Sequence, residues 1–216
     1  MVKIKGLGTF DTVPQVVIDI MNEDIPALNS RLSKRWNIDR RIEIGACLHS
    51  PIGIALMTEA MAAITWLVEH GVNLNEKYNH SFAIAVRYCD ENIIRYLVEN
   101  GAEVIPAFPF GGKYGTDAFV EALNGDKLNN LSLIHSLGHT VEQYGGNAFL
   151  DVIMENNKQA IDFFIENGVD INHIAVGGSI FRDSKSTSYI NQHIVAKNMA
   201  VKPLLPISVE LIVIFC

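Results

Sequence analysis

The fold of this chain is decided by residues 81–101, which read SFAIAVRYCDENIIRYLVENG. The apolar run at 82–86 predicts a first short helix, and Asp90 marks the start of a second. The apolar residues of the second helix recur at the spacing of one helical face: Ile93, Ile94, Leu97 and Val98. Gly101 then ends this helix, because glycine adopts the left-handed conformation at little cost. The stretch therefore predicts two short helices joined by a tight turn.

The same pattern recurs along the chain. A small or apolar residue stands sixteen positions before a glycine in four segments: Ala55 to Gly71, Ala85 to Gly101, Ala122 to Gly138, and Val152 to Gly168. A period of thirty to thirty-seven residues is typical of stacked helical units. Neither helix of such a pair can bury its apolar face alone, so neighbouring pairs must stack. We expect an all-α fold of about four to six helix-turn-helix units.

The two ends of the chain depart from this pattern. Residues 1–48 are predicted to form a degenerate capping repeat, in which Asn37 would take the left-handed turn position sixteen residues after Met21. Residues 49–175 hold the clear repeats. Residues 176–216 fit no repeat and are expected to form an atypical cap or a tail, either docked on the stack or used in a dimer contact.

Three of these units end in a motif that resembles the ankyrin repeat. The family's closing pattern, L-L-x-x-G-A-D-V-N, is similar to the segments at 67–75, 97–104 and 164–172, and its opening pattern, T-P-L-H-x-A, is similar to Ser50–Ala55. The resemblance implies an ankyrin-like solenoid with a concave face lined by the first helices. Because the units lack part of the opening motif and repeat every thirty instead of thirty-three residues, we expect short or absent β-hairpins.

Two sets of residues are candidates for binding a partner. The insertion at 105–115 carries three aromatic residues among prolines and glycines, although its phenylalanines could instead fold back over the stack. On the first helices, the resemblance places several polar residues, together with Met57, Thr58 and Met154, on the concave face, where the alternative is ordinary solvated surface. The predicted partner-binding residues are Tyr78, Arg87, Tyr88, Phe108, Phe110, Tyr114, Glu121, Asn124, Asp151 and Glu155.

Composition limits the class of partner. A net charge of -7 gives no sign of binding to nucleic acid or to an anionic membrane. No apolar run is long enough to cross a bilayer, and no leader peptide is recognisable, so we expect a cytoplasmic protein. The basic residues around Trp36 are interpreted as a solvated cap face. The three cysteines, Cys47, Cys89 and Cys216, are interpreted as buried thiols in a reducing compartment.

The histidines and glycines suggest no cofactor. His135 and His139 have the spacing of a metal-binding pair, but Gly138 lies between them at a helix end, so neither a metal nor a cofactor is expected. His70, His80 and His173 are expected at the surface near turns. Gly6 and Gly8 resemble the start of a dinucleotide fingerprint, but the third glycine of that motif is missing.

These observations lead to one main functional hypothesis and two alternatives. The main hypothesis is a non-catalytic module that binds another protein through the concave face and the loops between repeats. One alternative is a groove that binds or transforms a small molecule, using Glu121, Asp151 and Glu155 as acids or bases. The other is an acidic inhibitor of a basic protein, which the net charge suggests. The oligomeric state is left open.

Overall fold

A computed structural model describes residues 1–76, 80–104, 117–170 and 189–190 of the chain. The described part is mostly helical, as the repeats predict. It divides into two compact units, Met1–Leu133 and Ile134–Cys216. The two units are described separately below. The predicted aromatic residues Tyr78, Phe108, Phe110 and Tyr114 lie outside the described residues.

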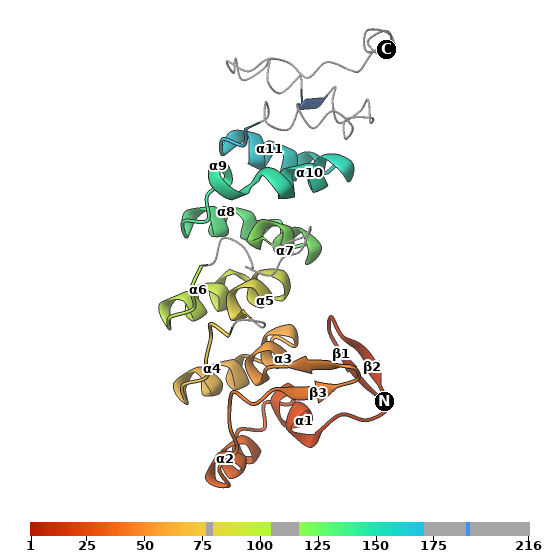
Figure 1. Ribbon diagram of the computed structural model, residues 1–216, viewed down its shortest axis with the longest axis vertical. Coiled ribbons are helices and arrows are strands. Elements are labelled where there is room, and N and C mark those ends of the chain that lie inside the picture. The colour runs from red at the N-terminus through yellow and green to blue at the C-terminus, as the bar shows by residue number, and fades with distance from the viewer. Residues whose placement is uncertain (77–79, 105–116, 171–188, 191–216) are drawn as a thin grey trace, which may run out of the picture. The chain divides into compact units, whose positions relative to one another are not determined.

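The first unit contains a row of short helices. Each of these is the first helix of a helix pair, and each packs on the next: α1 (Gln15–Met21), α3 (Pro51–Met57), α5 (Ser81–Tyr88) and α7 (Ala118–Asn124). The second helices lie along one side of this row: α2 (Ile25–Ser33), α4 (Met61–Glu69) and α6 (Glu91–Glu99). Helix α8 (Asn129–Ser136) crosses the boundary between the two units. Figure 1 shows the α3, α5 and α7 helices of this row one above another.

Burial differs sharply between the two sets of helices. All seven residues of α3 are buried, whereas α6 buries only Ile94 and Leu97. The first helices therefore form the centre of the unit, and each second helix covers them with one apolar face. This difference follows from the sequence, since α3 is apolar along its whole length and α6 is amphipathic.

The left-handed turns repeat with a constant spacing. Backbone φ is positive at Glu23, Glu59, Asp126 and Asn156, which lie between the two helices of a pair. It is positive again twelve residues later, at Arg35, Gly71, Gly138 and Gly168, and also at Gly101. The predicted left-handed glycines are thus confirmed. The prediction for Asn37 is wrong, because Arg35 holds that conformation in the first helix pair, where the repeat has lost its glycine.

Side-chain hydrogen bonds join successive helix pairs of the first unit. The Asp39 carboxylate accepts from the Asn73 backbone N–H at 2.8 Å. One repeat further on, the Asn75 side-chain oxygen accepts from the Glu103 N–H at 2.9 Å, and its NH₂ donates to the Gly101 carbonyl at 2.9 Å. These contacts satisfy backbone groups in the turns that follow the second helices, so they fix the spacing between pairs.

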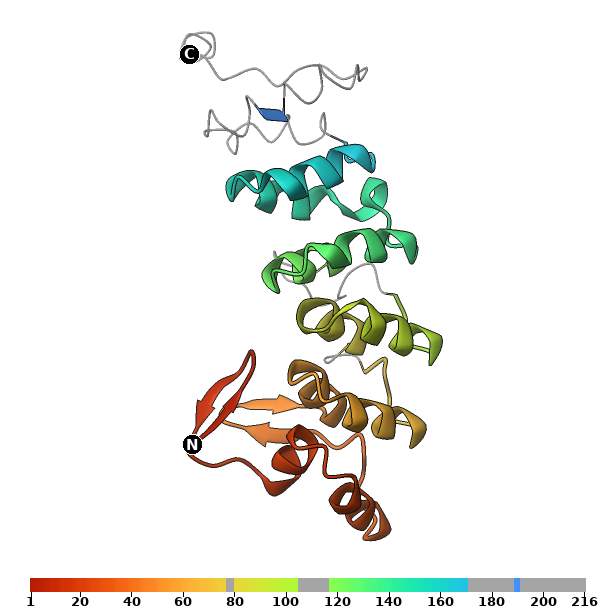
Figure 2. The same ribbon diagram turned by 180° about the vertical axis from the view of Figure 1, so that it is seen from behind.

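The first unit also contains two antiparallel hairpins. Strand β1 (Val2–Ile4) pairs with β2 (Gly8–Phe10), and β3 (Ile42–Ile44) pairs with β4 (Cys47–His49). Seen from behind, the hairpins lie on the opposite side of the first helices from α2 and α4 (Figure 2). The hairpin β3–β4 fits the expectation of short hairpins between repeats. The hairpin β1–β2 was not predicted.

The second unit is built around α10 and α11. Its described helices after α8 are α9 (Val141–Tyr144), α10 (Gly146–Met154) and α11 (Lys158–Glu166). Phe149 and Phe164 are fully buried between α10 and α11, with ring centroids 5.9 Å apart. The Tyr189 hydroxyl donates to the Asp162 carboxylate of α11 at 2.7 Å, and Ile190 is buried. Residues 189–190 therefore pack on this helix pair.

Two expectations about single residues are wrong. His80 is buried, because it directly precedes α5 at a point where Ser81 and Phe82 are also enclosed, and this burial lowers its pKa. Cys47 is exposed, because it begins the solvent-facing strand β4. Cys89 is buried as predicted: its thiol donates to the Leu56 carbonyl, and burial raises its pKa to about 12. Cys89 therefore remains a thiol at neutral pH.

Candidate functional site

The structure brings together the predicted site residues of the first unit. Arg87 and Tyr88 form the last turn of α5, and Glu121 and Asn124 lie on the neighbouring helix α7. The α5 and α7 helices pack side by side, and Arg87 of α5 contacts Glu121 of α7. Asn124 is exposed, and Arg87 and Tyr88 are partly exposed. We refer to Arg87, Tyr88, Glu121 and Asn124 as the α5–α7 patch.

An ion pair joins the two helices of the α5–α7 patch. The Arg87 Nη1 atom lies 3.2 Å from the Glu121 Oε2 atom. The Arg87 side chain is 38% exposed, whereas that of Glu121 is 11% exposed. Burial raises the pKa of the Glu121 carboxyl, and Arg87 opposes this shift as a neighbouring charge and as a hydrogen-bond donor. The guanidinium is therefore the group that a ligand can reach, and the carboxylate holds it in place.

Two residues that were predicted to lie on the concave face are buried instead. Met57, expected on the concave face, is 5% exposed, and Glu121 as a whole residue is 8% exposed. Both residues are enclosed where neighbouring first helices pack against one another. The sequence pattern could not indicate this, because helical periodicity gives the direction of a residue around its own helix and not the distance to the next helix.

Backbone contacts fix the carboxyl end of α5. A Cβ added to Gly125 would lie only 1.9 Å from the Arg87 carbonyl oxygen, so α7 and the turn after it can approach α5 this closely only with glycine. The Asn130 side chain donates to the carbonyls of Val86 and Cys89, each at 3.0 Å. These contacts satisfy carbonyl groups at the end of α5 and hold Arg87 and Tyr88 in position.

Further charged residues border the patch. Lys127 forms an ion pair with Asp90 at 2.7 Å, and this contact lowers the pKa of the Asp90 carboxyl. Lys5 forms an ion pair with Glu59 in the turn after α3. These four residues were not among the predicted site residues. Their signal was weak, since each stands in a turn or a hairpin and their pairing joins segments that are far apart in the chain.

The tip of the hairpin β1–β2 lies against the patch. A Cβ added to Gly6 would lie 2.3 Å from the Tyr88 hydroxyl oxygen and 2.6 Å from Cζ of the ring. Lys5 also donates to the Tyr88 carbonyl at 3.4 Å. The Arg87 guanidinium carbon lies 5.5 Å from the centroid of the Tyr88 ring. The alternation of apolar and polar residues around Gly6 and Gly8 is the sequence signal that could have revealed this hairpin.

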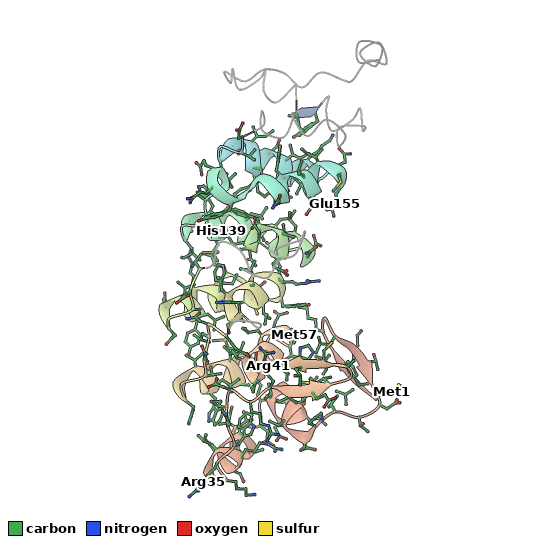
Figure 3. The ribbon with its side chains drawn as sticks, viewed as in Figure 1. Met1, Arg35, Arg41, Met57, His139 and Glu155 are labelled. Carbon is green, nitrogen blue, oxygen red and sulfur yellow. The ribbon has the colours of Figure 1, made fainter. Side chains whose placement is uncertain are left out.

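The remaining predicted site residues belong to the second unit. Asp151 is half-buried on α10, and burial raises the pKa of its carboxyl. Glu155 is exposed at the carboxyl end of α10, where Figure 3 labels it, next to the exposed Met154. Asp151 and Glu155 belong to the second unit, whereas Glu121 belongs to the first.

The histidine pair and the basic cluster have separate structural roles. His135 Nδ1 accepts from the Val141 N–H at 3.2 Å, and the His139 ring stacks on Tyr144 at 4.4 Å. Among the described residues, no group of three metal-ligating side chains is found. In the basic cluster, Arg31 is paired with Asp19 and Arg41 with Glu76, each at 2.5 Å. Arg35 lies beyond the end of α2 (Figure 3).

The chain was also compared with known proteins. No protein-family model matches it, and no curated protein matches it. In the portion of the chain that the structure describes, no helix has both the length and the apolar character needed to cross a membrane.

Proposed function

We propose that this chain is an ankyrin-like helical-repeat protein that binds another protein and has no catalytic activity of its own. The observation that carries this proposal is the row of first helices in the first unit. Within this row, side chains of neighbouring helix pairs meet, as Arg87 of α5 and Glu121 of α7 do. Left-handed turns twelve residues apart are consistent with repeated helix pairs. Repeat arrays of this kind commonly present extended surfaces to other proteins.

The α5–α7 patch is the proposed centre of the binding surface. Arginine and tyrosine are enriched at the energetic centres of protein interfaces, because they combine apolar area with directional hydrogen bonding. Arg87 is held by Glu121 and by the packing of Gly125 on its backbone. A side chain held in advance loses less conformational entropy when a partner binds. Asn124 extends the patch along α7 as an exposed hydrogen-bonding group.

The alternative of an enzymatic groove has less support. Burial raises the pKa values of Glu121 and Asp151, a property that catalytic carboxyls can share. However, Glu121 is engaged with Arg87, and a general acid or base must reach its substrate within hydrogen-bonding distance. We therefore favour binding over catalysis. Strong turnover of a substrate that is lost in Glu121→Gln would reverse this preference.

The experiment that tests the proposal compares two substitutions of the same type. Asn124→Arg places a bulky cation on the patch, whereas Asn92→Arg places it on the exposed face of α6. Both variants and the unaltered protein are used as baits in an extract of the native cells, and captured proteins are measured again with purified components. We expect Asn124→Arg to weaken binding at least about tenfold, an effect of about 1.4 kcal/mol, and Asn92→Arg to leave it unchanged.

Two results would count against this surface. If both variants bind a purified partner as well as the unaltered protein does, the binding surface lies elsewhere. In that case a bait whose residues 106–114 are replaced by a Gly-Ser linker tests the inter-repeat insertion. If no bait binds any protein in purified form, the proposed function itself is wrong. Circular dichroism of each variant checks that its helical fold is intact.

A further inference from the structure

The hairpin β1–β2 has no clear role in the repeat pattern, and its tip lies where the proposed function needs an open surface. Lys5, Gly6 and Leu7 form the tip, and we call these three residues the hairpin tip. Gly6 lies against the Tyr88 ring, and Lys5 reaches both Glu59 and the Tyr88 carbonyl. The tip therefore covers part of the α5–α7 patch.

We propose that the hairpin tip is an autoinhibitory strap, which covers Tyr88 in the free protein and is displaced when a protein partner binds the α5–α7 patch. This inference rests on the proposed function. It adds a form of regulation to that function, because access to the patch then depends on release of the tip.

The contacts of the tip are weak, as displacement requires. The side chains of Lys5 and Glu59 are 52% and 34% exposed, so water and salt screen their ion pair strongly. The hydrogen bond from Lys5 to the Tyr88 carbonyl is long, at 3.4 Å. The Gly6 backbone also lies on the Tyr88 ring, and Gly6 has no side chain to deepen this contact.

The residue that leads into the tip is held much more firmly than the tip itself. Ile4, at the end of β1, is 1% exposed, while Lys5 and Gly6 are exposed. Gly6 and Gly8 both have positive φ, at 78° and 116°, in a region of backbone conformation that glycine reaches at little cost. The tip can thus move away from Tyr88 while Ile4 stays buried, and tethering returns it quickly when the partner leaves.

Two glycine substitutions separate release of the tip from general damage to the hairpin. In Gly6→Val, the new side chain collides with Tyr88 and forces the tip away. In Gly8→Val, the backbone is strained as well, because φ is 116°, but a Cβ at this position meets nothing within 4 Å. Gly8→Val is therefore the matched control for strain alone.

The first measurement follows exposure of Tyr88 in the full chain. Tetranitromethane nitrates accessible tyrosine rings, and mass spectrometry of the peptide containing Tyr88 gives the rate at this residue. We expect nitration of Tyr88 to be several-fold faster in Gly6→Val than in the unaltered protein, and unchanged in Gly8→Val. Equal rates in all three proteins would overturn the strap, since the tip would then not control access to the ring.

The second measurement uses peptides selected from a random phage-displayed library with the Gly6→Val protein as bait. If the open state is about one-tenth populated, peptides that need Tyr88 bind Gly6→Val roughly tenfold more tightly than they bind the unaltered protein. Loss of binding in Gly6→Val combined with Tyr88→Ala confirms the site. Equal affinity of such peptides for the open and the unaltered protein overturns the strap but leaves the binding function in place. Faster nitration without any selected peptide supports the strap and counts against the binding function.

Discussion

Helices α3 and α6 belong to the same repeat pattern, yet they contribute to the protein in different ways. Every residue of α3 is buried, whereas α6 buries two apolar residues and exposes an ion pair between Glu91 and Arg95. The contrast predicts that the row of first helices contributes more to the stability of the first unit than the second helices do. The second helices expose an outer face, and the proposed α5–α7 patch lies on the first helices.

The largest effect is expected from truncating a buried side chain of α3. Leu56→Ala in α3 removes a fully buried side chain and leaves a cavity, so we expect a loss of about 2–5 kcal/mol in the free energy of unfolding. Arg95→Ala in α6 breaks an exposed pair and should cost less than about 1 kcal/mol. Urea unfolding followed by circular dichroism measures both. Similar losses in the two variants would show that the second helices matter as much as the first.

A smaller effect is expected at the contact between α5 and the turn after α7. Gly125→Ala places a methyl group against the Arg87 carbonyl, and we expect the strain to cost about 1–3 kcal/mol. Gly146→Ala is the control, because a Cβ there meets nothing within 4 Å and alanine favours the helix by up to about 1 kcal/mol. Thermal unfolding distinguishes the two. A neutral Gly125→Ala would mean that the two helices can separate freely.

The helix caps allow a comparison of the two sets of helices with one type of substitution. The Ser50 hydroxyl caps α3 by accepting from the buried Gly53 N–H at 3.1 Å, and the Asp24 carboxylate caps α2 by accepting from the Ala27 N–H at 3.0 Å. We expect Ser50→Ala to cost about 1–2 kcal/mol and Asp24→Ala about 0.5–1 kcal/mol, since water can replace only the exposed cap. Denaturant midpoints provide the comparison, and a larger loss for Asp24→Ala would contradict it.

The smallest expected effect is a change in the pH dependence of stability. Burial raises the pKa of Glu121 in the folded protein, so the unfolded chain loses this proton at lower pH than the folded chain. Stability therefore falls as pH rises from the ordinary glutamate pKa, about 4.3, through the raised value. In Glu121→Gln this fall is absent, so the variant gains stability relative to the unaltered protein across that window.

Unfolding midpoints of Glu121→Gln and the unaltered protein, measured between about pH 4 and pH 8, test this difference in stability. Glu99→Gln, a substitution of the same type on exposed α6, is the matched control. If the profile of Glu121→Gln differs from that of the unaltered protein no more than the profile of Glu99→Gln does, the ion pair with Arg87 cancels the effect of burial at this site. A stability that instead rises with pH only when Glu121 is present would show that pairing outweighs burial.

Much of the fold could be predicted because its signals are local. The left-handed glycines at 71, 101, 138 and 168 and the buried faces of the second helices follow from spacing and helix-ending chemistry. The first helix pair was placed two residues out of register, because Arg35 occupies the position where the other pairs have glycine. The assignment to an ankyrin-like class stays a prediction, as do the three segments at 1–48, 49–175 and 176–216 and the cytoplasmic location.

The candidate site could be predicted only in part. The resemblance placed Arg87, Tyr88, Glu121 and Asn124 on the concave face of the first helices, but it could not reveal that Glu121 is enclosed or that Lys5 reaches Glu59. Such contacts join segments 34 and 54 residues apart. No short-range pattern encodes them.

The sequence by itself determined the helix pairs, their turns and the apolar faces that must be buried, since these depend on residues within one or two turns of each other. Only the tertiary structure decided which polar groups meet: the pairing of Arg87 with Glu121, the close approach of Gly125 to α5, and the position of the hairpin tip on Tyr88. The physical reason is that the packing distance between helices depends on side-chain volumes from several segments at once, and a single stretch of sequence contains only one of them.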